Sequence, residues 1–337
     1  MPALRVKRHN ACFLPSRQVK LKSQLNRKGD VIMKPITQEN SRLGFVGIGY
    51  MGRPIARPLL ESGFKLTAYD REPSKAEELI QYGGVVAESV AELSSSCNVV
   101  LSCLPSDEAV LDTYKAPDGV FAHAHRGSVV IDMSTVHPVT SQELSRLGSQ
   151  RGLEVLDVTI SGSTPTAENG LLTLFGGGNK ERFDTAESIF RVIAKKYFYL
   201  GPNGSGATMK LVVNTLLGIG MQAIAESVAL GEKAGLDRNR MLEVLSQTAV
   251  VAPAHVGKLQ RAMSRDYSPQ FPIRLMNKDF GLILELASTV GARMPAAGAA
   301  FEINARQSDE GAEQDFSAVI LQMEKRALLG SNGNGRT

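Results

Sequence analysis

Two side chains near the start of one apolar segment have the types and spacing needed for proton transfer. Lys210 and Asn214 are four residues apart in residues 207–234, whose apolar pattern predicts one long helix, so they share a helix face. A lysine amine can accept and return a proton once burial or a neighbouring cation lowers its pKa. An asparagine amide cannot carry the proton, but it can orient a polar molecule. The pair therefore predicts acid/base chemistry centred on Lys210.

A glycine-rich loop at the start of the regular sequence predicts a dinucleotide site. The loop follows an apolar, strand-like run at 43–46 and opens a helical pattern over 51–63. In such a loop the first glycine permits the turn, the second admits the pyrophosphate, and the third lets strand and helix pack closely. The phosphates would lie at the positive N-terminus of the helix. The loop residues assigned to the cofactor are Gly47, Ile48, Gly49, Tyr50, Met51 and Gly52.

The end of the second predicted strand carries two charges that indicate different cofactors. Asp70 lies 18 residues after Gly52, where a carboxylate can accept hydrogen bonds from the ribose hydroxyls of NAD and repel a 2′-phosphate. Arg71, beside it, could instead bind the phosphate of NADP. We expect NAD, because a carboxylate so close disfavours the phosphate, and NADP is the alternative.

The elements around these residues alternate between strands and helices as far as residue 202. Strand-like runs lie at 43–46, 65–69, 98–103, 128–132, 153–158, 172–175 and 195–200. Helical patterns lie at 51–63, 74–82, from 107 onward, 138–151 and 180–193. Such alternation predicts βαβ units and a mostly parallel sheet. Beyond residue 206 the patterns are helical only, at 207–234, 238–246, 256–263, 274–290 and 315–328.

We therefore expect an α/β chain with two domains. A Rossmann-type, doubly wound parallel sheet occupies 41–202, and an all-α domain occupies 203–330; a long interdomain helix joins them. Residues 211–230 are apolar around most of the helix, so we expect them to run through the core of the second domain. Residues 1–40 are expected to be a basic extension outside the fold, and 331–337 a disordered tail.

Charge and composition limit the function classes. Eight lysine and arginine residues and one aspartate lie in 1–32, whereas the whole 337-residue chain has a net charge of +4. The rest of the chain is therefore mildly acidic, and nothing in it indicates a nucleic-acid surface.

The extension could arise from a start codon assigned upstream of Met33, be a disordered arm, or be a mitochondrial transit peptide. Three cysteines without a CxxC pair indicate a reducing compartment, which we take to be the cytoplasm unless the transit peptide is genuine. The longest uncharged run, 211–225, is too short for a membrane span.

Three further segments accompany the glycine loop. They read Asp157-Val158-Thr159-Ile160-Ser161-Gly162-Ser163, then Gly204-Ser205-Gly206-Ala207-Thr208-Met209-Lys210 running on to Asn214, and finally Phe271 followed by Lys278-Asp279. With the glycine loop, these motifs resemble, in order, those of the β-hydroxyacid dehydrogenase family. That family includes 3-hydroxyisobutyrate dehydrogenases, tartronate semialdehyde (2-hydroxy-3-oxopropionate) reductases and glyoxylate/succinic semialdehyde reductases. The resemblance covers residues 43–329.

The resemblance implies an NAD(P)-dependent enzyme that moves a hydride to or from a small β-hydroxy acid or semialdehyde. It implies an active site between two domains, with Lys210 as the catalytic group, and a homodimer or homotetramer. The implied substrate-side residues are Ser161, Gly162, Ser163, Asn214, Phe271 and Asp279. The implied cofactor-side residues are Leu104, Pro105, Ser134, Thr135 and Lys278. One departure is Ser163, which stands where the family usually has a second glycine.

Ordinary structural roles for these residues and other functions for the chain are the alternatives to this interpretation. A lysine near a helix start is usually a solvated residue, and Lys278-Asp279 could be a surface pair. His123 and His125 lack a third partner, so we expect no metal site, and we expect His137 to line the site without catalysing. Imine reductases on a similar fold usually lack the lysine, and an inactive cofactor-binding scaffold would also be expected to lose it; Lys210 is present.

Overall fold

The computed structural model describes residues 34–306 and 309–330, so the basic segment 1–32 and the tail 331–337 lie outside the described residues. The folded part begins earlier than the expected boundary at residue 41. Ile36 is buried, its N–H donates to the Thr185 carbonyl at 2.9 Å, and its own carbonyl accepts from Ser188 Oγ. These contacts fasten residues 35–40, which we had assigned to the extension, to the N-terminal domain.

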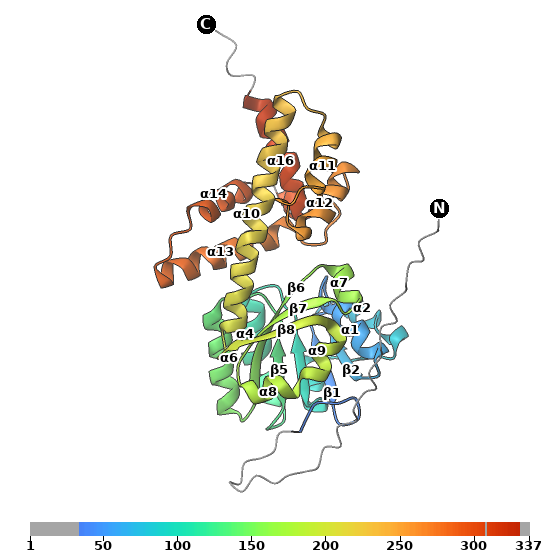
Figure 1. Ribbon diagram of the computed structural model, residues 1–337. Helices are drawn as coiled ribbons and strands as arrows, with labels where there is room; N and C mark the ends of the chain where they lie inside the picture. The colour runs from blue at the N-terminus through green and yellow to red at the C-terminus, as the bar shows by residue number, and fades with distance from the viewer. Residues whose placement is uncertain (1–33, 307–308, 331–337) are drawn as a thin grey trace, which may run out of the picture. The chain divides into compact units, whose positions relative to one another are not determined.

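An eight-stranded, mostly parallel sheet organises the first part of the chain (Figure 1). The strand order is β3-β2-β1-β4-β5-β6-β7-β8, and only the β6–β7 pair is antiparallel. The doubly wound α/β prediction is therefore confirmed. The strands are β1 (Arg42–Val46), β2 (Lys65–Tyr69), β3 (Val85–Val86), β4 (Val99–Ser102), β5 (Val129–Asp132), β6 (Glu154–Ser161), β7 (Leu172–Gly177) and β8 (Ala194–Gly201).

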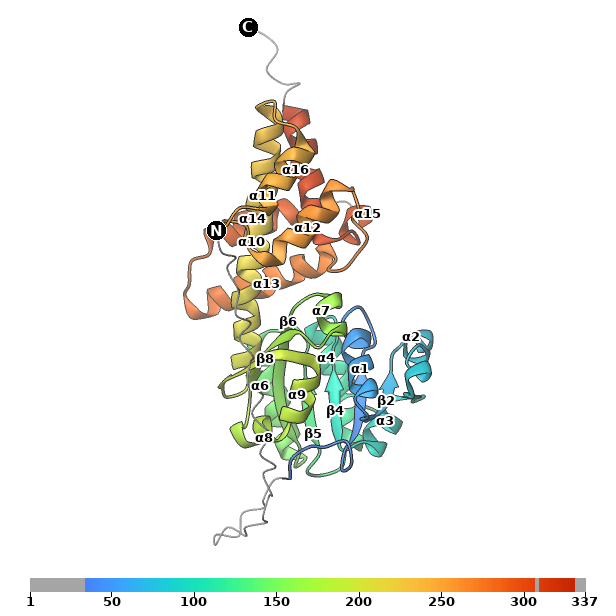
Figure 2. The same cartoon turned by 45° about the vertical axis from the view of Figure 1, so that its right-hand side comes forward.

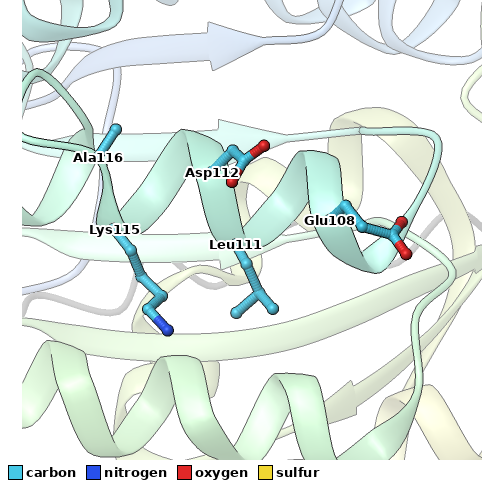
Figure 3. A pocket seen from close by; sticks show the side chains of 5 residues that line it. All are labelled: Glu108, Leu111, Asp112, Lys115 and Ala116. Carbon is cyan, nitrogen blue, oxygen red and sulfur yellow. The ribbon is translucent and has the colours of Figure 1, made fainter.

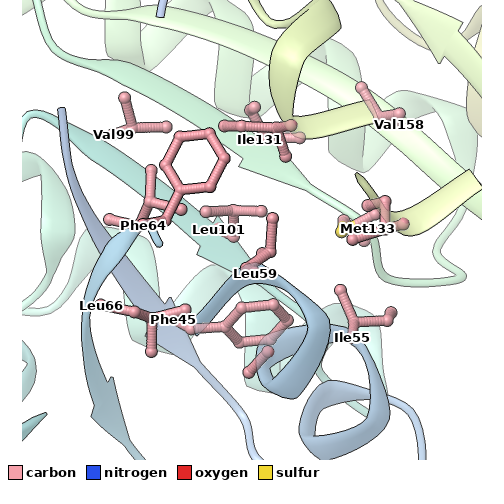
Figure 4. Packing of buried hydrophobic residues seen from close by; sticks show 14 of the residues in the cluster. Phe45, Ile55, Leu59, Phe64, Leu66, Val99, Leu101, Ile131, Met133 and Val158 are labelled. Atoms are coloured by element: carbon pink, nitrogen blue, oxygen red, sulfur yellow. The ribbon is translucent and has the colours of Figure 1, made fainter. Parts of the chain in front are cut away.

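Helices cover both faces of this sheet, because alternate strand residues point to opposite faces. On one face, Phe45, Leu101 and Ile131 pack against Ile55 and Leu59 of the first helix (Figure 4). A second cluster on the other face joins the remaining strand positions to α3–α6. The helices are α1 (Gly52–Glu61), α2 (Pro73–Glu77), η1 (Ile80–Tyr82), α3 (Val90–Ser96), α4 (Asp107–Lys115), α5 (Val120–His123), α6 (Pro138–Gln150), α7 (Thr164–Glu168), α8 (Lys180–Thr185) and α9 (Glu187–Ile193).

The described residues beyond 204 are helical, and α10 (Ser205–Lys233) links them to the sheet (Figures 1 and 2). Its first turns contact β6 and β7, and its later turns contact the other helices. These are α11 (Arg238–Ser246), α12 (Pro253–Met263), α13 (Ile273–Val290), α14 (Pro295–Ala305), α15 (Asp309–Ala312), η2 (Phe316–Ala318) and α16 (Val319–Gly330).

The expectation that α10 is buried on all sides is wrong. Val212, Leu216 and Leu230 are 50%, 72% and 72% exposed, because the neighbouring helices pack against the other side of α10, where Leu211, Met221 and Val228 are buried. By length and composition alone α10 could also cross a membrane, a test that core helices of soluble proteins pass as well.

Sequence periodicity missed several short elements. The strand β3 and the helices α3, α5 and α14 were not predicted, and the helix expected over 180–193 is divided into α8 and α9. The division lies where the Thr185 carbonyl accepts from Ile36 instead of continuing the helix ladder. A partner 149 residues away in the sequence leaves no local signal.

We predict that Gly218→Ala lowers stability whereas Gly281→Ala does not. A Cβ at Gly218 in α10 would lie 2.4 Å from Cζ of Phe280, so α13 would have to move; we expect a loss of about 1–3 kcal/mol in the free energy of unfolding. A Cβ at Gly281 in α13 meets nothing within 4 Å, and alanine should stabilise the helix by about 0.5–1 kcal/mol. Chemical denaturation of both variants measures the difference; equal effects would contradict the close α10–α13 contact.

Candidate active site

The glycine loop has the geometry that its motif predicts. Gly47 has a φ of +90°, and a Cβ there would lie 2.4 Å from the Cys103 carbonyl oxygen. A Cβ at Gly52 would lie 1.8 Å from the Gly47 carbonyl oxygen, so only glycine lets α1 start this close to β1. A Cβ at Gly49 would meet nothing within 4 Å, which leaves its backbone open to a ligand. The three glycines therefore do three different things, and only Gly49 faces free space.

Asp70 is tied to this loop. Its Oδ2 accepts the N–H of Ile48 at 2.8 Å, and its Oδ1 accepts the N–H of Glu72 at 2.9 Å. A carboxylate oxygen can accept more than one hydrogen bond, so both oxygens keep lone pairs for ribose hydroxyls. Arg71, next to it, is exposed. Asp70 and Arg71, the two residues expected to discriminate between NAD and NADP, thus follow the carboxyl end of β2 beside the loop.

The two expected nicotinamide-side loops are joined by a hydrogen bond. Leu104, which with Pro105 follows β4, donates its N–H to Ser134 Oγ after β5 at 2.9 Å. The carbonyl of the next residue, Thr135, accepts from the Lys278 amine of α13. Lys278 therefore contacts one of the loops expected on the cofactor side.

A buried polar cluster connects α10 and α13. The Asn214 amide nitrogen donates to Asp279 Oδ2 at 2.6 Å, and Lys278 Nζ lies 3.0 Å from Asp279 Oδ1. Asn214 and Asp279 are each only 1% exposed. Asn214 Oδ1 is also buried, and no residue in the described part of the chain donates to it. Because buried polar atoms are normally paired, this oxygen is a candidate acceptor for a ligand hydroxyl.

Lys210 lies one turn before Asn214 on α10. Burial lowers the pKa of its amine below the ordinary value of 10.5, and the Lys278 charge lowers it further, whereas the Asp279 charge raises it. Among the residues that the structure describes, Lys210 Nζ makes no hydrogen bond or ion pair. An amine whose pKa is lowered in this way gives up and takes back a proton more readily than an ordinary lysine, which is what an acid/base group needs.

The expected substrate loop begins where β6 ends. Ser161 is half-buried and Gly162 has a φ of +149°. Ser163 caps α7, and its N–H and hydroxyl both pair with Thr166 Oγ1. The hydroxyl of Ser163 thus adds one contact to Thr166 that a glycine could not make, and the backbone N–H of Ser163 is already paired. Thr164 Oγ1 also donates to the Tyr50 carbonyl at 3.4 Å, so this loop adjoins the glycine loop.

Not every predicted residue joins this cluster. Phe271 lies two residues before α13, and its N–H donates to the buried Asp315 at 3.1 Å; no described contact takes it to Asn214. His123 and His125 bond to backbone carbonyls, and the described residues contain no group of three or more metal-ligating side chains. A surface depression on α4, lined by Glu108, Leu111, Asp112, Lys115 and Ala116, contains none of the predicted site residues (Figure 3).

Sequence reasoning gave no role to two buried aspartates behind the site, Asp132 and Asp157. Asp132 bonds to Ser134, and Asp157 accepts backbone N–H groups at the start of α10. Asp157 is the first residue of the motif 157–163, and its place in that motif was the only sequence feature that could have indicated a role for it. Their partners lie 2 to 50 residues away, so the bonds themselves leave no local pattern.

We predict that Gly49→Ala weakens dinucleotide binding without loss of stability. The added methyl group has room in the free protein but occupies space that the motif assigns to pyrophosphate. Gly52→Ala is the contrast, because its Cβ collides with backbone and should lower the melting temperature as well. Calorimetric titration with nicotinamide dinucleotides and thermal unfolding separate the two; undiminished binding to the Gly49 variant would contradict the assignment.

Known proteins match both parts of the chain. Residues 42–201 match a family described as the NAD-binding domain of 6-phosphogluconate dehydrogenase. Residues 204–323 match one described as the NAD-binding domain of NADP-dependent 3-hydroxyisobutyrate dehydrogenase. The boundary between the two matches falls at the start of α10.

Whole proteins match over most of their length. Glyoxylate/succinic semialdehyde reductase 1 of Arabidopsis thaliana is 36% identical over 82% of this chain and 96% of its own. The 3-hydroxyisobutyrate dehydrogenase of Pseudomonas aeruginosa is 33% identical over 82% and 96%. A crystal structure of 3-hydroxyisobutyrate dehydrogenase from Salmonella typhimurium has a TM-score of 0.77 at 26% identity, over 83% of this chain and 99% of that one. An imine reductase from Pseudomonas sp., 20% identical with a TM-score of 0.56, shares the fold alone.

The motifs, their placement at one sheet edge and these similarities agree with one another. The glycine loop, with open space at Gly49, suits the pyrophosphate of a dinucleotide, and the matched families are named for that cofactor. The two relatives named above and an NAD-dependent L-serine dehydrogenase of Pseudomonas aeruginosa, 33% identical, are all named as dehydrogenases or reductases. The chain therefore belongs to the β-hydroxyacid dehydrogenase family of NAD(P)-dependent oxidoreductases.

Proposed function

We propose that this protein is an oxidoreductase of the 3-hydroxyisobutyrate dehydrogenase type, in which Lys210 is the general acid/base. The observation that carries the proposal is the cluster at the start of α10. It combines an amine with a lowered pKa, a buried unpaired acceptor on Asn214, and a lysine bonded to the cofactor-side loops. The domain limits proposed for it are 41–202 and 203–330, with residues 35–40 added to the first.

In the oxidative direction, Lys210 Nζ takes the hydroxyl proton of a small β-hydroxy acid while the carbon bearing that hydroxyl gives up a hydride and becomes an aldehyde. The nicotinamide, when bound, accepts this hydride at C4. In reduction the protonated amine of Lys210 returns the proton to the oxygen as negative charge develops there. Asn214, held by Asp279, orients the hydroxyl without exchanging a proton.

The substrate's carboxylate would be held by the loop at Ser161 and Gly162, and Phe271 would lie on the substrate side. The backbone N–H of Ser163 donates to Thr166, so it is not free for a carboxylate, and the Ser163 hydroxyl is a polar group that a glycine would lack. Small acids carrying an aldehyde or hydroxyl, such as those in the names of the relatives, suit a site with one cationic amine and one amide. We propose NAD as the preferred cofactor because Asp70 faces the loop, with NADP, through Arg71, as the alternative.

The alternatives differ at Lys210. A scaffold that binds cofactor without catalysis has no use for a lowered lysine pKa. An imine reductase would be supported only by reduction of a cyclic imine that does not require Lys210. We propose a cytoplasmic enzyme, in keeping with the unpaired cysteines Cys97 and Cys103.

We predict that a screen of small acids with both cofactors shows turnover that depends on Lys210. Tartronate semialdehyde, succinic semialdehyde, glyoxylate and methylmalonate semialdehyde, with their alcohols, would be assayed by absorbance of the reduced nicotinamide. Lys210→Met should lower kcat at least about 100-fold and leave cofactor binding intact, since it removes only the proton carrier. Turnover by the variant equal to that of the wild type would contradict the assigned role.

The pH dependence of oxidation should move in opposite directions in two variants. Oxidation needs neutral Lys210, so its rate rises as pH passes the pKa of the amine. Asp279 raises that pKa, so Asp279→Asn should move the rise to lower pH. Lys278 lowers it, so Lys278→Met should move the rise to higher pH. Profiles of kcat against pH measure both shifts; shifts of the same sign would contradict the charge assignment.

We also propose that a second copy of this chain covers the exposed apolar stripe of α10. Val212, Leu216 and Leu230 lie on one face of the helix, with the exposed Glu226 and Ser227 between the first two and the last. Exposed apolar side chains gathered on one face often mark an interface. Leu216→Lys should therefore reduce the mass measured by light scattering, whereas Val250→Lys, at an exposed position outside α10, should not. A wild-type monomer would contradict the proposal.

A further inference from the structure

A row of polar side chains crosses three neighbouring strands beneath the site. Ser102 of β4 is paired in register with Asp132 of β5, and Asp132 with Asp157 of β6. Residues paired in register on parallel strands point to the same face of the sheet. All three are at most 2% exposed. Ser102 and Asp132 are the last residues of β4 and β5, whereas Asp157 lies midway along β6, four residues before that strand ends at Ser161. The row therefore lies beneath the loops that follow β4 and β5 and against the start of α10, whose N–H groups Asp157 accepts.

Asp132 organises the cofactor side of the row. A single oxygen, Oδ1, accepts the Ser102 and Ser134 hydroxyls, both at 2.6 Å. Ser134 Oγ in turn accepts the N–H of Leu104. The carboxyl group thus fixes the loops after β4 and β5 relative to each other. Oδ2 is buried and has no hydrogen-bond partner within the described part of the chain. Oδ1 alone therefore accepts the hydrogen bonds that join the two loops.

Asp157 organises the catalytic side. Its Oδ1 accepts the N–H of Gly204 and its Oδ2 that of Ala207, each at 3.0 Å. These N–H groups belong to the start of α10, where a helix has no internal partners for them and favours a negative group. Burial raises the pKa of Asp157 to about 6, so at neutral pH it is the carboxylate that accepts both.

Direct packing of backbone against backbone allows the start of α10 little freedom to move relative to β6 and β7. A Cβ at Gly206 would lie 2.4 Å from the Phe175 carbonyl oxygen and 2.5 Å from that of Asp157. Thr159 Oγ1 donates to the Gly206 carbonyl at 2.8 Å. Lys210 follows Ala207 by three residues, or about one helical turn. Any change in how the first turn sits on β6 and β7 is therefore passed to the Lys210 amine.

We propose that Asp132 and Asp157 are positioning residues that set the two halves of the site separately. Asp132 fixes the loops on the cofactor side, and Asp157 seats the helix that carries Lys210. The proposal rests on the proposed function of Lys210 and adds two residues that touch neither substrate nor cofactor. The proposal therefore predicts that substitution of Asp132 mainly weakens cofactor binding, whereas substitution of Asp157 mainly lowers kcat.

The variants follow from which oxygens are used. Asp157→Asn presents an NH2 group to one of the two backbone N–H donors, Gly204 or Ala207. It should therefore remove one of the two hydrogen bonds that hold the start of α10. Asp132→Ala removes the shared acceptor, whereas Asp132→Asn can keep an oxygen at the Oδ1 position and should rescue the function. Glu324→Gln is the control, because it alters a buried pair with Arg238 in the helical domain, away from the row.

Amide hydrogen exchange and kinetics together give the readouts. Asp157→Asn should speed exchange at Gly204 and Ala207 and lower kcat about 10- to 100-fold, the cost of misplacing a catalytic group by about 1 Å. The Kd for cofactor should stay within about twofold.

Asp132→Ala should speed exchange at Leu104 and weaken cofactor binding about tenfold or more, and Asp132→Asn should restore both. Glu324→Gln should change neither kcat nor cofactor Kd beyond about twofold. If Asp132→Ala fails to fold, Ser134→Ala removes the acceptor of Leu104 and should speed exchange at Leu104. Exchange is then the deciding readout, because Ser134 is itself expected on the cofactor side.

Two results would overturn the proposal: unchanged exchange at these amides, or equal losses of kcat and cofactor affinity in both variants. The exchange measurement needs no turnover. If the wild-type protein reduces none of the acids, the proposed function fails, and exchange still decides whether the aspartates hold these segments.

Discussion

The site depends on the contact between the first turn of α10 and the backbone of β6 and β7. Gly206 has no side chain, so the helix lies directly against two strand carbonyls, while Asp157 accepts the N–H groups that the helix start leaves free. This contact places Lys210 and Asn214 at the carboxyl edge of the sheet, where ligands of doubly wound folds bind. A longer connection would leave the amine free to move relative to the cofactor loops.

Charges around Lys210 then decide what its amine can do. Burial and the Lys278 cation favour the neutral form, and Asp279 opposes them. Asp279 also holds the Asn214 amide, so one carboxylate both limits the pKa shift and orients the neighbouring group. Lys278 reaches the Thr135 carbonyl, which connects the same charge cluster to the loops beside the cofactor. In the proposed mechanism, adjacent residues of α13 would therefore connect proton transfer at Lys210 with the loops that hold the cofactor.

Sequence patterns predicted the parts of this arrangement that have a local cause. The glycine loop was recognisable because Gly47 and Gly52 have backbone requirements that no other residue meets, and α10 because its helical apolar pattern continues over residues 207–234. The exposure of Leu216 was not predictable, since periodicity cannot show how many sides of a helix have neighbours. The hydrogen bonds of Asp157 depend on contacts between segments far apart in the sequence, and the boundary at residue 41 missed Ile36 for the same reason. The pairing of Ser163 with Thr166 is local, three residues apart, and the sequence analysis did not recognise it.

The most direct test is the pKa of the Lys210 amine itself. Lysines labelled with 13C at Cε would be titrated by NMR in the cofactor-bound protein, and the Lys210 signal identified by its loss in Lys210→Arg. The account predicts a pKa clearly below the ordinary 10.5, with a further fall when Asp279 is replaced by asparagine. A value at or above 10.5 would contradict it, because such an amine would stay protonated and could not take the hydroxyl proton near neutral pH.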